Sequence, residues 1–188
     1  RSSRDGSKAA KATSVRCCWD DENLYVAFEC EDRDIWGTFT KHDDPIFTQD
    51  CVESFLCPDC DLARYFEINL SPRNVVFDAL IVNPTGLHVT NADTSAGWDC
   101  VGLRTAVLLD GTLEDRSDTD RGWGAEKAIP FAALARSAPK LGEQWRVNFF
   151  RIDRSPEPVE HQAWSPTLVD PPAFHRPARF GQLLFTQE

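Results

Sequence analysis

The chain of 188 residues contains no methionine and no run of about 18 apolar residues. Without methionine, a haem or copper site would have no thioether ligand. Without a long apolar run, no segment is expected to span a membrane. Basic residues are also scarce, since 20 Lys and Arg stand against 30 Asp and Glu, for a formal charge of −10. Nucleic acid is therefore not expected as a partner, because it would require a basic face.

Cysteine is present in an odd number, seven, so at least one thiol has no partner within the chain. Secreted proteins usually avoid free thiols, whereas reducing compartments tolerate them. The first 14 residues are polar and rich in Arg, Ser and Ala, a composition shared with organelle transit peptides. We expect residues 1–14 to be a flexible tail or linker, and the compartment is left open.

Short strand patterns separated by turn residues recur along the rest of the chain. They cover residues 15–19, 24–30, 64–70, 75–82, 103–109, 122–129, 145–152 and 179–186, with a further strand at the end of the stretch 43–56. The only helical pattern is short, Pro130–Arg136, with proline near its start. This pattern predicts an all-β fold over residues 15–188: an antiparallel β-sandwich, immunoglobulin-like or jelly-roll-like, with one short helix.

The stretch 43–56 combines an aromatic residue with a strand carboxylate. Alternation along the strand places Cys51, Glu53 and Phe55 on one face, and Phe47 lies six residues before Glu53. An aromatic ring can cover the C–H face of a sugar while a carboxylate accepts hydrogen bonds from its hydroxyls. The simpler interpretation is a loop hydrophobe followed by a solvated carboxylate.

Polar residues on the neighbouring strands are predicted to share the face of Glu53. They are Tyr65, Glu67, Asn69 and Asp78. Such a row is either a binding face or the solvated side of an antiparallel sheet.

Metal and catalytic motifs are weak. The single Cys57-Pro58-Asp59-Cys60 has no second Cys pair or His pair to complete a zinc site. No Ser-His-Asp or Cys-His pattern stands out, and acids are too abundant for one catalytic pair to be singled out. Acidic loops could hold calcium through oxygen ligands or could be solvated turns; they contain Asp43, Asp44, Asp115, Asp118 and Asp120.

Taken together, several segments resemble the carbohydrate-binding module family 9-like domains. In order they are Trp19–Phe28, Asp50–Phe55, Tyr65–Asn69, Gly122–Trp123, Ile129–Phe131, Trp145–Phe149, Trp164–Thr167 and Phe174–Gly181. The resemblance implies a β-sandwich without catalytic machinery, which clamps the end of a sugar chain between two aromatic residues. It also implies a secreted or periplasmic location, and structural calcium in some members.

Carried onto this sequence, the resemblance assigns one aromatic of the clamp to Phe47, the second to Trp164, and the strand carboxylate to Glu53. Further candidates for the sugar site are Tyr65, Glu67, Asn69 and Asn148. A sugar-binding member would have Trp at position 47, and Phe offers a smaller face and no N–H. The family's opening segment is also not found before Val15, so we expect a longer protein or a partner that replaces its packing.

The predicted function is non-catalytic binding of an oligo- or polysaccharide. The alternative is a structural or interaction subunit of a larger protein complex, in which the sandwich persists and the sugar site has degenerated. A third hypothesis, a haem-binding sandwich, would need paired His or His with Lys, since methionine is absent.

Overall fold

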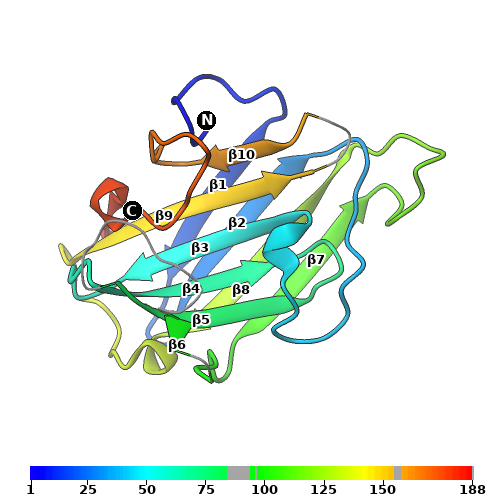
Figure 1. Ribbon diagram of the computed structural model, residues 1–188. Coiled ribbons are helices and arrows are strands. Elements are labelled where there is room, and N and C mark those ends of the chain that lie inside the picture. Colours follow the sequence, from blue (N-terminus) through cyan, green and yellow to red (C-terminus); the bar gives the residue numbers. More distant parts are fainter. Residues whose placement is uncertain (84–93, 96, 155–157, 188) are drawn as a thin grey trace.

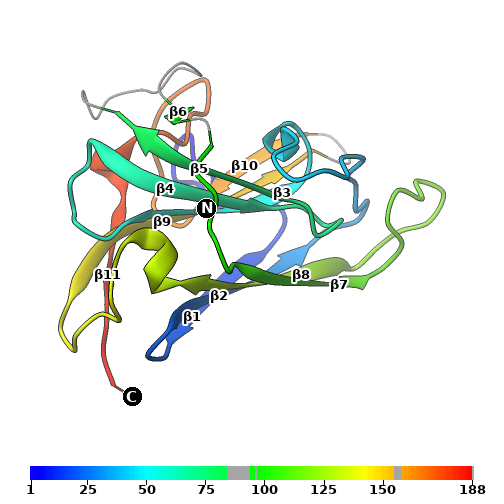
Figure 2. The ribbon, with the colours of Figure 1, turned by 90° about the horizontal axis from the view of Figure 1, so that it is seen from below.

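The structure, a computed structural model, describes residues 1–83, 94–95, 97–154 and 158–187. Two antiparallel sheets pack face to face, as Figure 2 shows with one layer above the other. The four-stranded sheet has the order β1-β2-β8-β7, with bounds Thr13–Trp19, Asn23–Glu31, Gly122–Pro130 and Arg104–Asp110. The predicted β-sandwich is confirmed.

The seven-stranded sheet runs side by side across Figure 1 in the order β10-β9-β3-β4-β5-β6, and β11 also pairs with β9. The strands are β3 Cys51–Cys57, β4 Arg64–Leu70, β5 Val76–Val82, β6 Thr94–Ser95, β9 Gln144–Asp153, β10 Glu160–Ala163 and β11 Gly181–Leu184. Helical structure in the described ranges is limited to 3-10 turns, η1 Ile46–Thr48, η3 Phe131–Leu134 and η4 Pro177–Arg179. The predicted short helix is therefore the single turn η3.

The main core lies between the two sheets and follows the predicted alternation. Leu24, Val26 and Phe28 of β2 are buried there, opposite Val52 and Leu56 of β3. Burying such side chains contributes about 1.5–3 kcal/mol each to folding. The alternation that places Val52 and Leu56 in this core turns Cys51, Glu53 and Phe55 to the outer face of the seven-stranded sheet.

This outer face carries a second apolar cluster and is not solvated as a plain sheet face would be. Phe55, Tyr65 and Phe150 are buried there beneath Phe174 and Phe180, which come from the loop before β11. The polar residues of this face are thus partly roofed over, and only a limited part of it stays open.

Residues before β1 differ from the predicted flexible tail. Ser2 forms a β-bridge with Gln162 of β10, and the side chain of Ser3 is fully buried. Figure 1 shows this segment, in dark blue, lying beside β10. The main chain of the segment continues the edge of the sheet, so it is part of the folded domain, and β1 begins at Thr13.

Asp78 also differs from its predicted place. The register pairs Asp78 with Ile68, and directly paired residues of adjacent antiparallel strands point to the same side. Ile68 belongs to the main core. Asp78 therefore points away from the face that carries Glu53 and Glu67.

All seven cysteines are free. Within the CxxC, Cys60 N donates to Cys57 O at 3.3 Å, so the motif forms a turn. In the part of the chain that the structure describes, no helix has the length and apolar character needed to cross a membrane.

Candidate functional site

A cavity of about 390 Å³ lies on the outer face of the seven-stranded sheet. Its walls come from η1, β3, β4, β5, β9, β10 and the loop before β11. The lining residues are Phe47, Glu53, Glu67, Phe77, Ile152, Arg154, His161, Pro172, Phe174 and His175.

The strand register places one row of side chains at or just beneath the floor of this cavity. Asn69 of β4 pairs with Phe77 of β5 and with Glu53 of β3, and Glu53 pairs with Phe150 of β9. The row therefore has an aromatic ring at each end and polar groups in the middle. This order follows from the sequence alternation of four neighbouring strands.

Each end of the row is extended upward by a second aromatic ring. Phe47 packs edge-on against Phe77, with ring centroids 5.1 Å apart. Phe174 stacks on Phe150 at 4.2 Å, with an interplanar angle of 12°. The cavity thus has aromatic walls from η1 on the β5 side and from the 164–180 loop on the β9 side.

Between these walls lie two buried carboxyl groups. Glu53 and Glu67 are only 2% and 4% exposed. Glu67 Oε1 accepts a hydrogen bond from Asn69 Nδ2 at 2.8 Å, and Glu53 Oε1 accepts one from Cys51 Sγ at 3.5 Å. Neither residue forms an ion pair with Lys or Arg among the described residues, although His175 Nε2 lies 3.7 Å from Glu67 Oε2.

Burial changes the protonation of this pair. It raises the pKa of Glu67 to about 7. It also raises the pKa of Glu53 well above its ordinary value, and the negative charge of Glu67 raises it further. One of the two groups therefore keeps its proton at neutral pH, so the floor offers both an O–H donor and a carboxylate acceptor.

His175 is held in place by a residue that does not itself line the cavity. Tyr65 is fully buried, and its hydroxyl lies 2.8 Å from His175 Nδ1. The imidazole also packs over Phe55, with ring centroids 5.1 Å apart. These contacts direct Nε2 of His175 toward Glu67.

Arg154 supplies a cation at the rim. Its main-chain N–H donates to Asp50 Oδ1 at 2.7 Å, which fixes the backbone just after β9. Its Nε is buried without a hydrogen-bond partner in the described ranges. Burial lowers the pKa of neighbouring His161, and the charge of Arg154 lowers it further, so this ring is neutral at pH 7.

The structure brings together three of the residues predicted for the sugar site, Phe47, Glu53 and Glu67. Tyr65 and Asn69 share their face and support them from below. Asn148 is occupied elsewhere, because its Nδ2 donates to Ser165 O at 2.8 Å and its Oδ1 accepts from Ser165 N at 3.0 Å.

Trp164 lies apart from Phe47. Its ring packs edge-on against Phe149 and lines a different cavity, of about 710 Å³, beside β1. A Cβ at position 181 would overlap this ring, so Gly181 is what lets Trp164 lie against the sheet. The predicted clamp between Phe47 and Trp164 is thus not formed in this structure, and Phe174 stands opposite Phe47 instead.

Sequence reasoning missed Phe77, Arg154, His161, Phe174 and His175. Phe77 lies next to Asp78 on β5, and its face depends on the register between β4 and β5, which alternation within one strand does not give. The other four come from β10 and from segments next to loops, whose paths no periodic pattern specifies.

Most of the acidic residues predicted as calcium ligands accept hydrogen bonds from loop N–H groups. Asp44 accepts from Thr40 N and Lys41 N, and Asp120 accepts from Ile35 N and Thr112 N. Asp115 accepts from both N and Oγ of Ser117. Their hydrogen bonds explain why these loops carry acids, and calcium at these positions stays a prediction.

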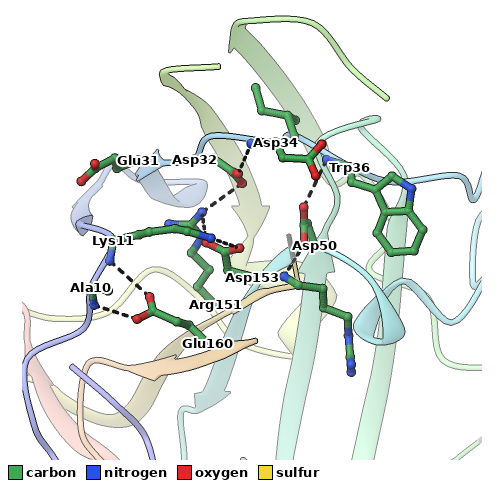
Figure 3. A network of polar contacts seen from close by, with 12 residues as sticks. Ala10, Lys11, Glu31, Asp32, Asp34, Trp36, Asp50, Arg151, Asp153 and Glu160 are labelled. Carbon is green, nitrogen blue, oxygen red and sulfur yellow. Dashed lines mark hydrogen bonds and ion pairs between the residues drawn. The ribbon is translucent and has the colours of Figure 1, made fainter. Parts of the chain in front are cut away.

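A second group of buried acids lies at the end of β9 (Figure 3). Arg151, 1% exposed, donates to Asp32 at 3.0 Å and to Asp153 at 2.8 Å. Lys11, from the segment before β1, donates to the other oxygen of Asp153 at 2.7 Å. Glu160 accepts from the main-chain N–H groups of residues 10 and 11. This network ties the first residues of the chain to the sheet.

Comparisons with known proteins agree with this architecture. The sequence profile of Carbohydrate-binding family 9 matches residues 8–185. An extracellular protein of Arthroderma benhamiae is 28% identical over 181 residues, 92% of this chain and 78% of that protein.

Two solved structures share the fold at 20% identity. One is a protein of Bacteroides uniformis assigned to carbohydrate binding, with a TM-score of 0.76 over 93% of this chain and 78% of its own. The other is a family 9 carbohydrate-binding module of Caldicellulosiruptor kristjanssonii in complex with cellotriose, with a TM-score of 0.61 over 97% and 79%. The resemblance predicted from the sequence is confirmed, and the chain belongs to carbohydrate-binding family 9.

Proposed function

We propose that this domain binds the end of an oligo- or polysaccharide, without catalysis, in the cavity between Phe47 and Phe174. The observation that carries the proposal is the row of paired residues Phe77, Asn69, Glu53 and Phe150, which places the buried carboxyl group of Glu53 between two aromatic walls. A sugar ring needs both kinds of surface, because its faces are apolar and its edges carry hydroxyls.

Each part of the cavity has a role in this proposal. Phe47 and Phe174 cover the two faces of a terminal sugar ring. The pair Glu53 and Glu67, which shares one proton at neutral pH, both accepts from and donates to hydroxyls. The unpaired Nε of Arg154 provides a further donor at the rim. The volume, about 390 Å³, is within the range of small-ligand sites and suits a chain end.

The choice of sugar follows the comparisons. The Caldicellulosiruptor module was solved in complex with cellotriose, which makes β-1,4-linked glucose chains the first ligands to test. Xylo-oligosaccharides, which lack the hydroxymethyl group, show whether the cavity requires that group.

An interaction subunit of a larger complex is the second candidate function. The separate cavity of about 710 Å³ favours it, because Trp164 at its rim is 46% exposed and the proposed sugar site makes no use of it. Large aromatic residues in such positions are common in protein interfaces.

Isothermal titration with cello- and xylo-oligosaccharides tests the first candidate. We expect a dissociation constant of millimolar or tighter for the unchanged chain, and at least a tenfold loss for Phe47→Ala and for Phe174→Ala, because each removes one stacking face. Trp164→Ala is the matched control, since it also removes an aromatic ring but from the other cavity, and should bind normally. Thermal melting of each variant verifies that it is folded.

Two results would contradict the proposal. One is binding that survives both phenylalanine changes and disappears in Trp164→Ala. The other is no heat with any sugar from a folded chain, which would favour the interaction subunit.

A further inference from the structure

A cluster of metal-binding side chains lies outside the proposed sugar site. His42, Asp43 and Asp99 come from two segments far apart in the sequence. Their nearest ligand atoms all lie within 4.8 Å of one another. His42 Nε2 is 3.5 Å from Asp43 Oδ1 and 3.3 Å from Asp99 Oδ1.

These separations suit a four-coordinate metal ion. Zinc binds nitrogen and oxygen at about 2.0–2.2 Å, so two ligand atoms of a tetrahedral site lie about 3.3–3.6 Å apart. Both distances from His42 Nε2 fall within or next to this range. An ion could therefore be bound with small rotations of exposed side chains and without movement of the backbone.

A buried carboxylate beneath the cluster is the independent observation that points to a ligand. Asp78 is only 6% exposed, and its main-chain N–H donates to Asp43 Oδ1 at 3.5 Å. Its Oδ2 accepts a hydrogen bond at 3.3 Å from the main-chain N–H of Cys100, the residue after Asp99. Its Oδ1 is buried with no hydrogen-bond partner in the described part of the chain. A buried acceptor without a partner is costly, and a cation bound nearby would offset part of that cost.

The local charges point the same way. Asp43 and Asp99 lie against His42, and the carboxylate of Asp78 lies beside Cys100 N, one residue after Asp99. Three carboxylates thus crowd around one imidazole. Their mutual repulsion is relieved when a divalent cation binds.

We propose that His42, Asp43 and Asp99 bind a divalent transition metal of the zinc type, and that the buried Asp78 supports them from beneath through its N–H bond to Asp43. The imidazole sets the class of metal, because nitrogen ligands suit zinc, cobalt or nickel, whereas calcium and magnesium take oxygen ligands. Asp43 lies four residues before Phe47, and Asp78 follows Phe77. By fixing Asp43, which accepts from the main-chain N–H of Asp78, the metal would hold the segment before η1 against β5. Phe47 of η1 and Phe77 of β5 build one wall of the aromatic cavity.

Cobalt(II) is the first probe, because its visible absorption reports both the geometry and the donor atoms. We expect one equivalent of Co²⁺ to give the strong visible bands of a tetrahedral site without thiolate charge-transfer absorption, and Zn²⁺ to displace it. His42→Ala should abolish the bands, and Asp99→Asn should weaken binding at least tenfold. Asp78→Asn should weaken it about 10–100-fold, as changes beside metal ligands do.

The controls separate this site from other places that attract cations. Asp118→Asn removes an exposed carboxylate from the 110–120 turn and should leave the titration unchanged. A Cys18→Ser, Cys60→Ser variant removes the two exposed thiols and should also bind cobalt normally. All of these positions except Asp78 are exposed, so the variants are expected to fold.

Three results would overturn the proposal. Bands that persist in His42→Ala, or thiolate absorption that disappears with the two cysteines, would place the metal elsewhere. Calcium that binds with a dependence on Asp43 and Asp99 while cobalt and zinc do not would show a site of the other metal class. None of these readouts involves sugar, so the test is independent of the proposed function.

Discussion

Two groups of buried carboxylates lie on opposite faces of the seven-stranded sheet, and they differ in whether a cation is paired with them. At the end of β9, Asp32 and Asp153 are each paired with Arg151, and Lys11 completes the pairing of Asp153. On the outer face, Glu53 and Glu67 have no such cation among the described residues. Paired charges are fixed and serve the fold, whereas the unpaired carboxyls keep hydrogen-bonding capacity for a ligand.

A buried lysine sharpens this comparison. Lys127 of β8 lies in the main core, where Nζ donates to Val52 O, Ser54 Oγ and Ile68 O. It therefore contacts the inner side of β3 and β4, directly behind the two glutamates. Burial lowers the pKa of Lys127 to about 7, and its charge acts on Glu53 and Glu67 only across the sheet. Lys127 is thus a nearby cation that makes no hydrogen bond to the carboxyl oxygens of Glu53 or Glu67.

Breaking the paired network should have the largest effect. Arg151→Met leaves Asp32 and Asp153 buried without their cation, and we expect a loss of about 3–5 kcal/mol in the free energy of unfolding. Urea denaturation at pH 7 measures it. Arg16→Met, which breaks the exposed pair with Glu29, is the matched control and should change little. Equal losses for both variants would refute the structural role of the network.

Replacing a carboxylate by an amide should change the free energy of unfolding in opposite directions in the two groups. Asp153→Asn weakens the hydrogen bonds from Arg151 and Lys11, and should destabilise the fold by about 2–3 kcal/mol. Glu53→Gln removes a carboxyl that burial already disfavours, and should stabilise it by about 1 kcal/mol at pH 8. Denaturation of the two variants side by side tests this. If Glu53→Gln destabilises as much as Asp153→Asn does, the two groups do not differ in the way described.

The ionisation of Glu67 should make the free energy of unfolding depend on pH, with a smaller effect than the loss of Arg151. Its pKa is about 7 in the folded state against an ordinary value of 4.5, so the folded state holds the extra proton between these values. The contribution is fully present below about pH 4.5 and is lost as the pH rises through 7. From pH 5 to 8 the free energy of unfolding of the unchanged chain should therefore fall by about 2–3 kcal/mol more than that of Glu67→Gln does. Identical pH profiles would show that Glu67 ionises normally.

The sequence predicted the parts of the site that depend on strand alternation. Glu53 and Glu67 lie on the face expected, because period-two patterning fixes faces within a strand. Phe47 of η1 also lies beside them, but the family resemblance had assigned it, not strand alternation. Asp78 was misplaced because its face relative to β4 depends on the register between the strands, which pairs it with Ile68.

Strand alternation could not predict the residues that loops contribute to the cavity. Trp164 and Phe174 are both aromatic residues in a proline-rich segment, and only the path of the chain decides which one faces Phe47. That path is set by tertiary contacts, such as the two hydrogen bonds between Asn148 and Ser165. The packed segment before β1 was missed for a similar reason, since its main chain pairs with β10 and its side chains show no periodic pattern.

A chemical-shift titration of the isotope-labelled chain with cellotriose tests most directly whether Glu53 and Glu67 form a ligand site. We expect the largest changes at Phe47, Glu53, Glu67 and Phe174, with little change around Trp164 and in the network of Arg151. Changes concentrated at Trp164 and β1, with the residues of the aromatic cavity unaffected, would contradict the account.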